Sequence, residues 1–174
     1  MKYVRNLSLV LTLLSAPALA QDPEALNRFR TGYELMQKRS YRNAAIELEQ
    51  AVAIDTSYGN AHYVLAQAYK VLNEYDKAIA SFAAARALGT KPARAARELG
   101  QLYHKAAISS FGQKKYRTAI GYFQNALEFN PQNAKAHYAM GLSYNGLRET
   151  AKAKAAFAKA VEADPKSAKA LNAL

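Results

Sequence analysis

The 174-residue sequence contains no cysteine and no tryptophan. The missing cysteine excludes disulfides, zinc sites with thiolate ligands and a thiol for lipidation, so the stability of the fold must come from packing alone. Glycine and proline are sparse, with 8 and 5 residues. Alanine, leucine and lysine are abundant instead, which favours helices over a β-sandwich or barrel. The length is that of one domain with a sizeable core.

The sequence also lacks an apolar run long enough to cross a membrane. The N-terminal run over residues 7–14 is far shorter than the roughly 20 residues that a transmembrane helix needs. It follows the cations Lys2 and Arg5 and precedes small residues at 18–20. This order of features is typical of a secretion signal that is cleaved before Gln21. The alternative interpretation is a buried N-terminal helix.

We therefore expect two parts in the chain. Residues 1–20 form a cleaved signal peptide, and residues 21–174 form an exported domain with no transmembrane span. The domain is periplasmic or secreted, and it is periplasmic if the source is a bacterium with two membranes.

Residues 21–174 show an internal repeat of 34 residues. In each unit an alanine precedes a large apolar residue by four positions and a second alanine by seven. These triplets are Ala44/Leu48/Ala51, Ala78/Phe82/Ala85, Ala119/Phe123/Ala126 and Ala153/Phe157/Ala160. An earlier helical pattern in each unit has a small residue at Gly32, Ala66, Ala107 or Gly141. The units are 25–58, 59–92, 100–133 and 134–167.

This pattern of small and aromatic positions resembles the tetratricopeptide repeat family over nearly all of residues 21–174. Unit 134–167 carries the most complete set of family positions: Gly141, Tyr144, Ala153, Phe157, Ala160 and Pro165. The tryptophan that family members often have early in the first helix is absent from all four units. The resemblance implies an all-α fold, a right-handed α-solenoid of four helix–turn–helix repeats.

Two segments depart from simple repetition. Residues 93–99 are an insertion of about two helical turns between the second and third units, which keeps the same helix faces in register. Their composition predicts one long helix from about Pro92 to Phe111, and a loop insertion is the alternative. Residues 168–174 begin like another first helix, with Leu171 and Leu174 on one face. We expect them to form a short C-terminal capping helix.

The sequence offers no set of catalytic or metal-binding residues. The three histidines, His62, His104 and His137, include no pair three or four residues apart. His62 and His137 occupy equivalent places in two units, and we interpret them as packing residues. Glu47 and Glu49, two residues apart, cannot face each other on a helix. We expect no enzyme activity, no metal and no cofactor.

In the family that the sequence resembles, the first helix of each unit lines a concave groove. Carrying this over by position predicts a partner-binding groove that contains Phe29, Tyr33, Tyr63, Gln67, Lys70, Lys105, Lys135 and Tyr138. Aromatic rings beside cations suit a peptide that offers aromatic and acidic groups. Some family members hold a peptide's C-terminal carboxylate with a set of five polar and basic residues. The corresponding places here carry that set only in part.

The charge of the chain favours acidic partners. Residues 21–174 contain 22 lysines and arginines against 13 acids. The cations cluster at Arg28/Arg30, Lys38/Arg39/Arg42, Arg86/Lys91/Arg94/Arg97 and Lys114/Lys115/Arg117. No nucleic-acid-reading motif accompanies them, so we expect no nucleic-acid partner. The leading hypothesis is a scaffold that binds a protein or peptide segment in its groove, as an accessory subunit of a cell-envelope assembly. The alternative is binding of an anionic envelope polymer or lipid surface through basic clusters on the convex side. The sequence leaves the partner, the pathway and the oligomeric state open.

Overall fold

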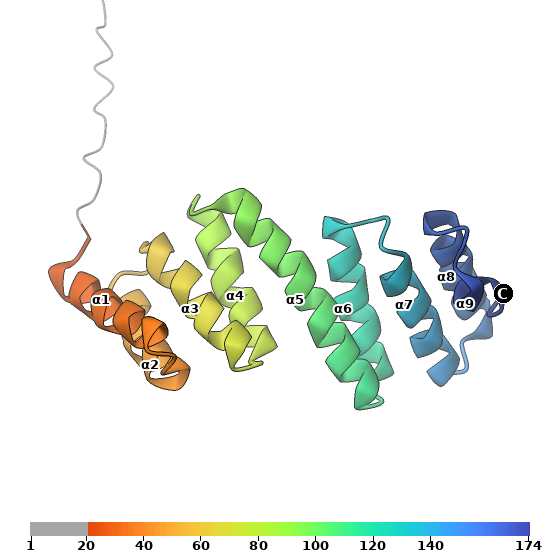
Figure 1. The fold of residues 1–174 in the computed structure, drawn as a ribbon, viewed down its shortest axis with the longest axis horizontal. Helices are drawn as coiled ribbons and strands as arrows, with labels where there is room; N and C mark the ends of the chain where they lie inside the picture. The colour runs from red at the N-terminus through yellow and green to blue at the C-terminus, as the bar shows by residue number, and fades with distance from the viewer. Residues whose placement is uncertain (1–20) are drawn as a thin grey trace, which may run out of the picture.

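The structure is a computed structural model that describes residues 21–174 (Figure 1). The predicted signal peptide lies outside the described residues. Within them every regular element is a helix, and there is no strand. The helices are α1 (Pro23–Gln37), α2 (Tyr41–Ile54), α3 (Gly59–Val71), α4 (Tyr75–Ala87), α5 (Pro92–Gly112), α6 (Tyr116–Phe129), α7 (Ala134–Gly146), α8 (Thr150–Ala163) and α9 (Ala168–Leu171).

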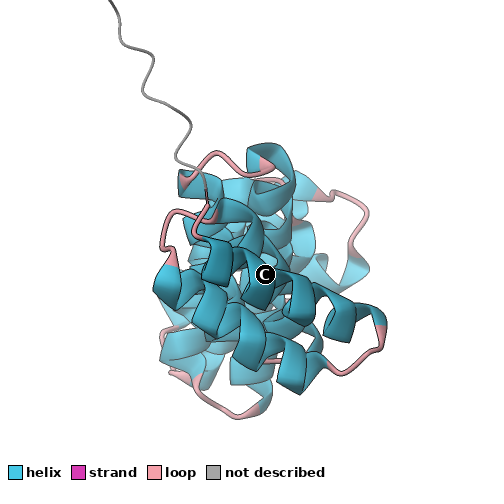
Figure 2. Ribbon diagram, turned by 90° about the vertical axis from the view of Figure 1, so that its left-hand side faces the viewer, coloured by secondary structure: helices cyan, strands magenta, loops and turns pink. Residues whose placement is uncertain are grey.

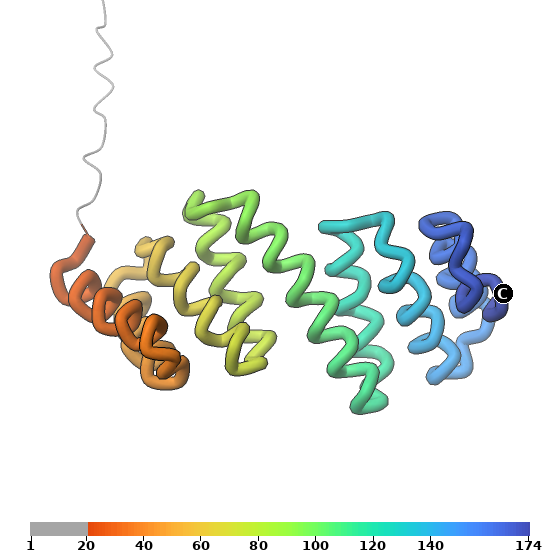
Figure 3. Tube along the Cα trace, viewed as in Figure 1, coloured from red at the N-terminus to blue at the C-terminus, as the bar shows by residue number. Residues whose placement is uncertain are grey.

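The helices pack as consecutive antiparallel pairs, and each pair stacks on the next along one axis (Figures 1 and 2). This arrangement confirms the predicted α-solenoid. The first helices of neighbouring pairs contact each other, α1 with α3 and α5 with α7. They therefore line the shorter, concave side. The turns within pairs follow one edge of the solenoid, at the bottom of Figure 3, and the turns between pairs follow the opposite edge.

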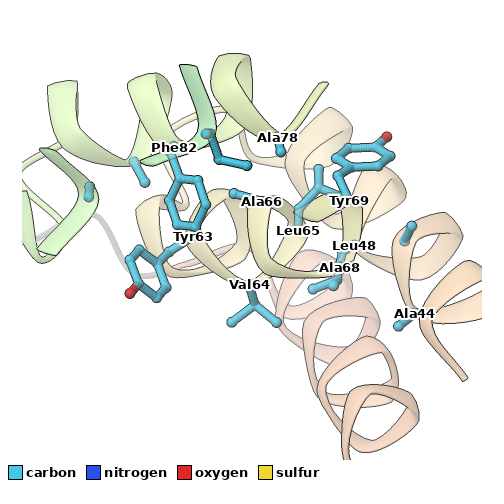
Figure 4. Packing of buried hydrophobic residues seen from close by; sticks show 14 of the residues in the cluster. Ala44, Leu48, Tyr63, Val64, Leu65, Ala66, Ala68, Tyr69, Ala78 and Phe82 are labelled. Carbon is cyan, nitrogen blue, oxygen red and sulfur yellow. The ribbon is translucent and has the colours of Figure 1, made fainter. Parts of the chain in front are cut away.

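Small residues let the two helices of each pair approach closely, as the repeat pattern predicts. A Cβ atom added at Gly141 would lie 2.5 Å from the Phe157 ring, and one added at Gly32 would lie 2.7 Å from Leu48. Ala153 is 1% exposed. In the second pair the ring of Phe82 fills the corresponding space (Figure 4). The large apolar residue of each triplet is thus the centre of its pair.

The turns within all four pairs share one backbone conformation. Each contains a residue with positive φ, at Arg39, Asn73, Lys114 or Arg148. The next residue donates its N–H to a carbonyl five residues earlier, as Ser40 does to Leu35 at 2.9 Å. This is the Schellman ending of a helix. Side chains after these turns therefore emerge at equivalent places in every repeat.

Two histidines fix the turns between pairs. Nε2 of His62 donates to the Thr56 carbonyl at 3.0 Å, and Nε2 of His137 donates to the Pro131 carbonyl at 2.9 Å. Only the ring nitrogen can be the donor, because a carbonyl oxygen only accepts. His137 is 9% exposed, so its interpretation as a packing residue is confirmed.

Helix α5 is the longest of the described helices, with 21 residues, and it runs without a break through residues 93–99. Ala95, Leu99 and Leu102 are buried against the second pair. Helix α9 packs on α8 through the buried Ala170. Leu171 and Leu174 stay about half exposed. The short cap thus makes its contact through an alanine and not through these leucines.

Candidate partner-binding groove

Two of the predicted groove residues form an aromatic pair on α1. The Phe29 ring is half-buried, with its centroid 4.9 Å from that of Tyr58. The Tyr33 ring lies 6.1 Å from Phe29 and is 47% exposed. Tyr33 is therefore the accessible ring of this pair, and Phe29 packs against Tyr58 of the first inter-pair turn.

Tyr63 does not stand in the groove, and the expectation of a free ring there is wrong. Only 2% of Tyr63 is exposed. Its ring meets Phe82 edge to face at 5.3 Å (Figure 4). Nζ of Lys91 lies 4.9 Å from the ring centroid, and the Arg94 guanidinium lies 5.9 Å from it. The start of α5 thus covers Tyr63 and makes it part of the core.

Tyr138 stands 75 residues after Tyr63, at the equivalent place of the fourth unit. Its ring packs on Phe157 at 5.5 Å, as Tyr63 packs on Phe82, but it is only partly buried. Gln67, one turn after Tyr63 on α3, is also partly buried. Of the two equivalent tyrosines, Tyr138 alone offers a ring to a partner.

Lys70 is not a free cation of the groove. Its Nζ lies 2.6 Å from Oε2 of Glu98, and only 30% of the lysine side chain is exposed. Glu98 belongs to the inserted residues 93–99, so the insertion supplies the carboxylate that forms an ion pair with Lys70. The prediction that Lys70 is available to a partner is therefore not supported by its contacts.

The structure brings a further set of residues together in a cavity beside α5. The cavity has a volume of about 610 Å³ and lies between α5, the C-terminal end of α6 and the start of α7. Its lining is Ala96, Arg97, Gly100, Gln101, His104, Lys105, Ala126, Phe129, Asn130 and Asn133. Lys105 was predicted as a groove residue. Arg97, Phe129 and Asn130 were not, because they come from the insertion and from the end of a second helix.

The cavity has an apolar floor and a basic rim. Ala96, Ala126 and Phe129 form apolar lining, and no acidic residue is among the lining residues. Arg97 and Lys105 supply positive charge at the rim. Gly100 is required here, because a Cβ atom at this position would lie 2.8 Å from Cβ of Phe129. Such a cavity suits an acidic group next to an apolar one.

His104 lies at the back of this cavity. Burial lowers the pKa of the His104 ring, and the positive charge of Lys135 lowers it further. Its Nδ1 is buried without a hydrogen-bond partner, and its ring meets the Phe123 ring at 5.7 Å. Of the predicted groove residues, Lys105 thus lines the cavity with His104, and Lys135 acts on His104 through its charge.

Two properties of residues 21–174 bear on the kind of site. No helix in this part of the chain is long and apolar enough to cross a membrane. Nor do its histidines and acids form a group of three or more that could hold a metal ion.

Comparison with known proteins agrees with the repeat architecture. Two tetratricopeptide repeat models match the chain, one at residues 29–92 and one at residues 110–174. No protein of curated function matches it. Among solved structures, the MamA RS-1 ArsTM double mutant is 22% identical, with 87% of this chain and 81% of that chain covered and a TM-score of 0.51. MamA 41-end from Desulfovibrio magneticus RS-1 is 22% identical over the same shares, with a TM-score of 0.50. These likenesses support the solenoid fold. The two matched segments cover most of the described residues, and the chain belongs to the tetratricopeptide repeat family.

Proposed function

We propose that this protein is an exported, non-enzymatic scaffold that binds a protein segment carrying acidic and aromatic residues. Its place is that of an accessory subunit in a cell-envelope assembly. The observation that carries the proposal is the cavity of α5, α6 and α7, with its apolar floor and its rim of cations without acids. The export part rests on the N-terminal sequence alone.

The chemistry of the cavity selects the partner. A carboxylate at the rim can accept charge-assisted hydrogen bonds from Arg97 and Lys105, and these are stronger than neutral ones. An aromatic or aliphatic side chain next to it can cover Phe129 on the floor. Asn130 and Asn133 add polar groups that can pair with a peptide backbone. A segment with an acidic residue beside a large apolar one meets all three requirements.

The accessible aromatic rings extend this surface along the solenoid. Tyr138 is on α7, whose Asn133 cap lines the cavity, and Tyr33 is on α1 at the other end. Rigid aromatic side chains serve as anchors because they cover a large area and lose little conformational freedom. The proposed surface therefore keeps Phe29, Tyr33, Gln67, Lys105, Lys135 and Tyr138 of the predicted set.

A peptide-display selection against the purified protein tests the proposal. We expect enriched peptides that combine Asp or Glu with Phe, Tyr or Trp. The variant Arg97→Glu/Lys105→Glu should weaken binding of a selected peptide at least tenfold, because it turns the basic rim acidic. The variant Lys154→Glu/Lys159→Glu makes the same change of charge on the outer helix α8, where both lysines are exposed.

The two variants distinguish binding at the cavity from attraction by the overall charge of the protein. Loss of binding in the rim variant together with retention in the α8 variant supports the proposal. If both variants lose the same affinity, net charge and not the cavity is responsible. Selected peptides without acidic residues would also contradict it.

A further inference from the structure

The turns within the four pairs place a row of cations along one edge of the solenoid, the lower edge in Figure 3. The positive-φ residue of the turn is Arg39 in the first pair, Lys114 in the third and Arg148 in the fourth. The second pair has Asn73 at this position. Four more cations flank the turns of the first and third pairs. These are Lys38, Arg42, Lys115 and Arg117. We call these seven cations the basic edge.

The cations of the basic edge are exposed and, among the described residues, none of them forms an ion pair or a cation–π contact. The acids of the second and fourth turns have partners of their own. Glu74 pairs with Lys77 at 2.8 Å, and Glu149 pairs with Lys152 at 2.7 Å. Asp76 accepts a hydrogen bond from the Tyr122 hydroxyl. The seven cations of the basic edge thus outnumber the acids near it, which are Glu34, Glu74, Asp76 and Glu149.

Four cations near the opposite edge are placed differently. Lys91 and Arg94 lie over the Tyr63 ring, and Arg86 lies over the Phe129 ring at 5.8 Å. Arg97 lines the cavity beside α5. These four residues formed one basic cluster in the sequence, and the structure assigns them to packing and to the cavity.

We propose that the basic edge docks the protein on a membrane surface rich in anionic phospholipid. Such a surface attracts exposed lysines and arginines without requiring a pocket or a matching shape. The edge has the exposed, unpaired cations that this binding needs. The Tyr116 ring at the start of α6 packs 5.7 Å from Phe111 and against Gly146, so this ring is not presented by the edge.

Docking on this edge leaves the peptide site free. The cavity opens near Asn130 and Asn133 in the turn between the third and fourth pairs, and this turn is on the opposite edge (Figure 3). The protein can therefore hold a partner segment while its basic edge faces the lipid. This inference does not depend on the peptide-binding proposal, since the two use different residues.

Co-sedimentation with vesicles tests the proposal. We compare vesicles of pure phosphatidylcholine with vesicles that contain one third phosphatidylglycerol. The test variant is Arg39→Asn/Lys114→Asn/Arg148→Asn. Asparagine tolerates positive φ, and the chain itself uses Asn73 at this turn position, so the variant removes charge without backbone strain. The control variant Lys154→Asn/Lys166→Asn/Lys169→Asn removes the same charge from exposed residues of α8, of the turn after it and of α9.

We expect binding to the phosphatidylglycerol vesicles only, and release as salt rises, because screening shortens the reach of exposed charges. Each lost cation should lower the partition coefficient about fivefold, so the test variant should lose roughly a hundredfold. The control variant should keep most of the binding.

Three results would overturn the proposal. They are equal binding to both kinds of vesicle, equal losses in the two variants, and binding to a soluble polyanion such as heparin with none to vesicles. A circular dichroism melt of the test variant shows whether it is folded. Its affinity for a selected peptide shows whether the peptide site is intact.

Discussion

Lys70 of α3 and Glu98 of α5 form an ion pair with 2.6 Å between Nζ and Oε2. Lys70 lies in the second unit, and Glu98 lies in the seven residues inserted before the third. The pair therefore joins the two halves of the solenoid at the point where the regular repeat is interrupted. The ion pair also makes Lys70 unavailable to a partner, although the position of Lys70 in the repeat predicted a groove residue.

Removing the Lys70–Glu98 ion pair should lower the free energy of unfolding only slightly. The loss should still be larger than for an ion pair that is more exposed to water. The side chains of Lys70 and Glu98 are 30% and 13% exposed, whereas those of Lys77 and Glu74 are 58% and 39% exposed. We expect a coupling energy of about 1 kcal/mol for Lys70–Glu98 and a smaller one for Lys77–Glu74. Double-mutant cycles with glutamine substitutions, followed by urea unfolding, measure both values. Equal couplings would mean that the α3–α5 pair is no more protected from water than a surface pair.

Tyr63 should behave as a core residue whose hydroxyl group lowers the stability of the folded state. Its ring is buried, and its hydroxyl is buried without a hydrogen-bond partner. Tyr63→Phe removes the unpaired polar group and should raise the free energy of unfolding by up to about 1 kcal/mol. Tyr63→Ala should lower it by about 3–5 kcal/mol, as for other large aromatic residues in cores. Chemical denaturation measures both. A Tyr63→Ala variant as stable as the parent would place the ring outside the core.

The repeat pattern in the sequence was enough to predict the helix pairs, because small and large residues alternate at fixed spacing. Gly141 and Phe157 meet as this spacing requires. The groove could not be predicted in the same way, since position in a repeat does not determine burial. Tyr63 and Tyr138 are equivalent by position, yet the start of α5 covers only Tyr63. The sequence did not predict the cavity for two reasons. Phe129 lies at the end of a second helix, which the family pattern assigns to the outside, and Arg97 lies in an insertion that the pattern does not contain.

Gly141 and Gly121 should respond in opposite directions to alanine. Alanine usually stabilises a helix interior by about 1 kcal/mol relative to glycine. A Cβ atom at Gly121 of α6 meets nothing within 4 Å, so Gly121→Ala should show this gain. At Gly141 the same atom lies 2.5 Å from the buried Phe157 ring, and overpacking should cost about 1–3 kcal/mol. Thermal melts of both variants check the signs. A stabilised Gly141→Ala would show that α7 and α8 can separate without loss.

His104 should make stability depend on pH on the acidic side of neutrality. Burial, followed by the charge of Lys135, lowers the pKa of His104 in the folded state. In the unfolded chain the ring titrates near its ordinary value of about 6.5. Between these two pKa values the unfolded state binds more protons than the folded state, so stability falls as pH falls. Above about pH 6.5 the ring is neutral in both states, and its contribution no longer changes.

The substitution His104→Gln isolates this effect, because glutamine is neutral at every pH while His62 and His137 remain in both proteins. Urea unfolding between pH 4.5 and 8 should give a steeper loss of stability below pH 6.5 for the parent than for the variant. Lys135→Gln should reduce the difference, since it removes the second cause of the lowered pKa. A bound carboxylate at the basic rim should raise the His104 pKa and shift the same titration upward, because an anion favours the charged ring. Following the His104 proton resonance with and without a selected peptide measures that shift directly. Parallel pH profiles for parent and variant would mean that the ring is as accessible to water in the folded protein as in the unfolded chain.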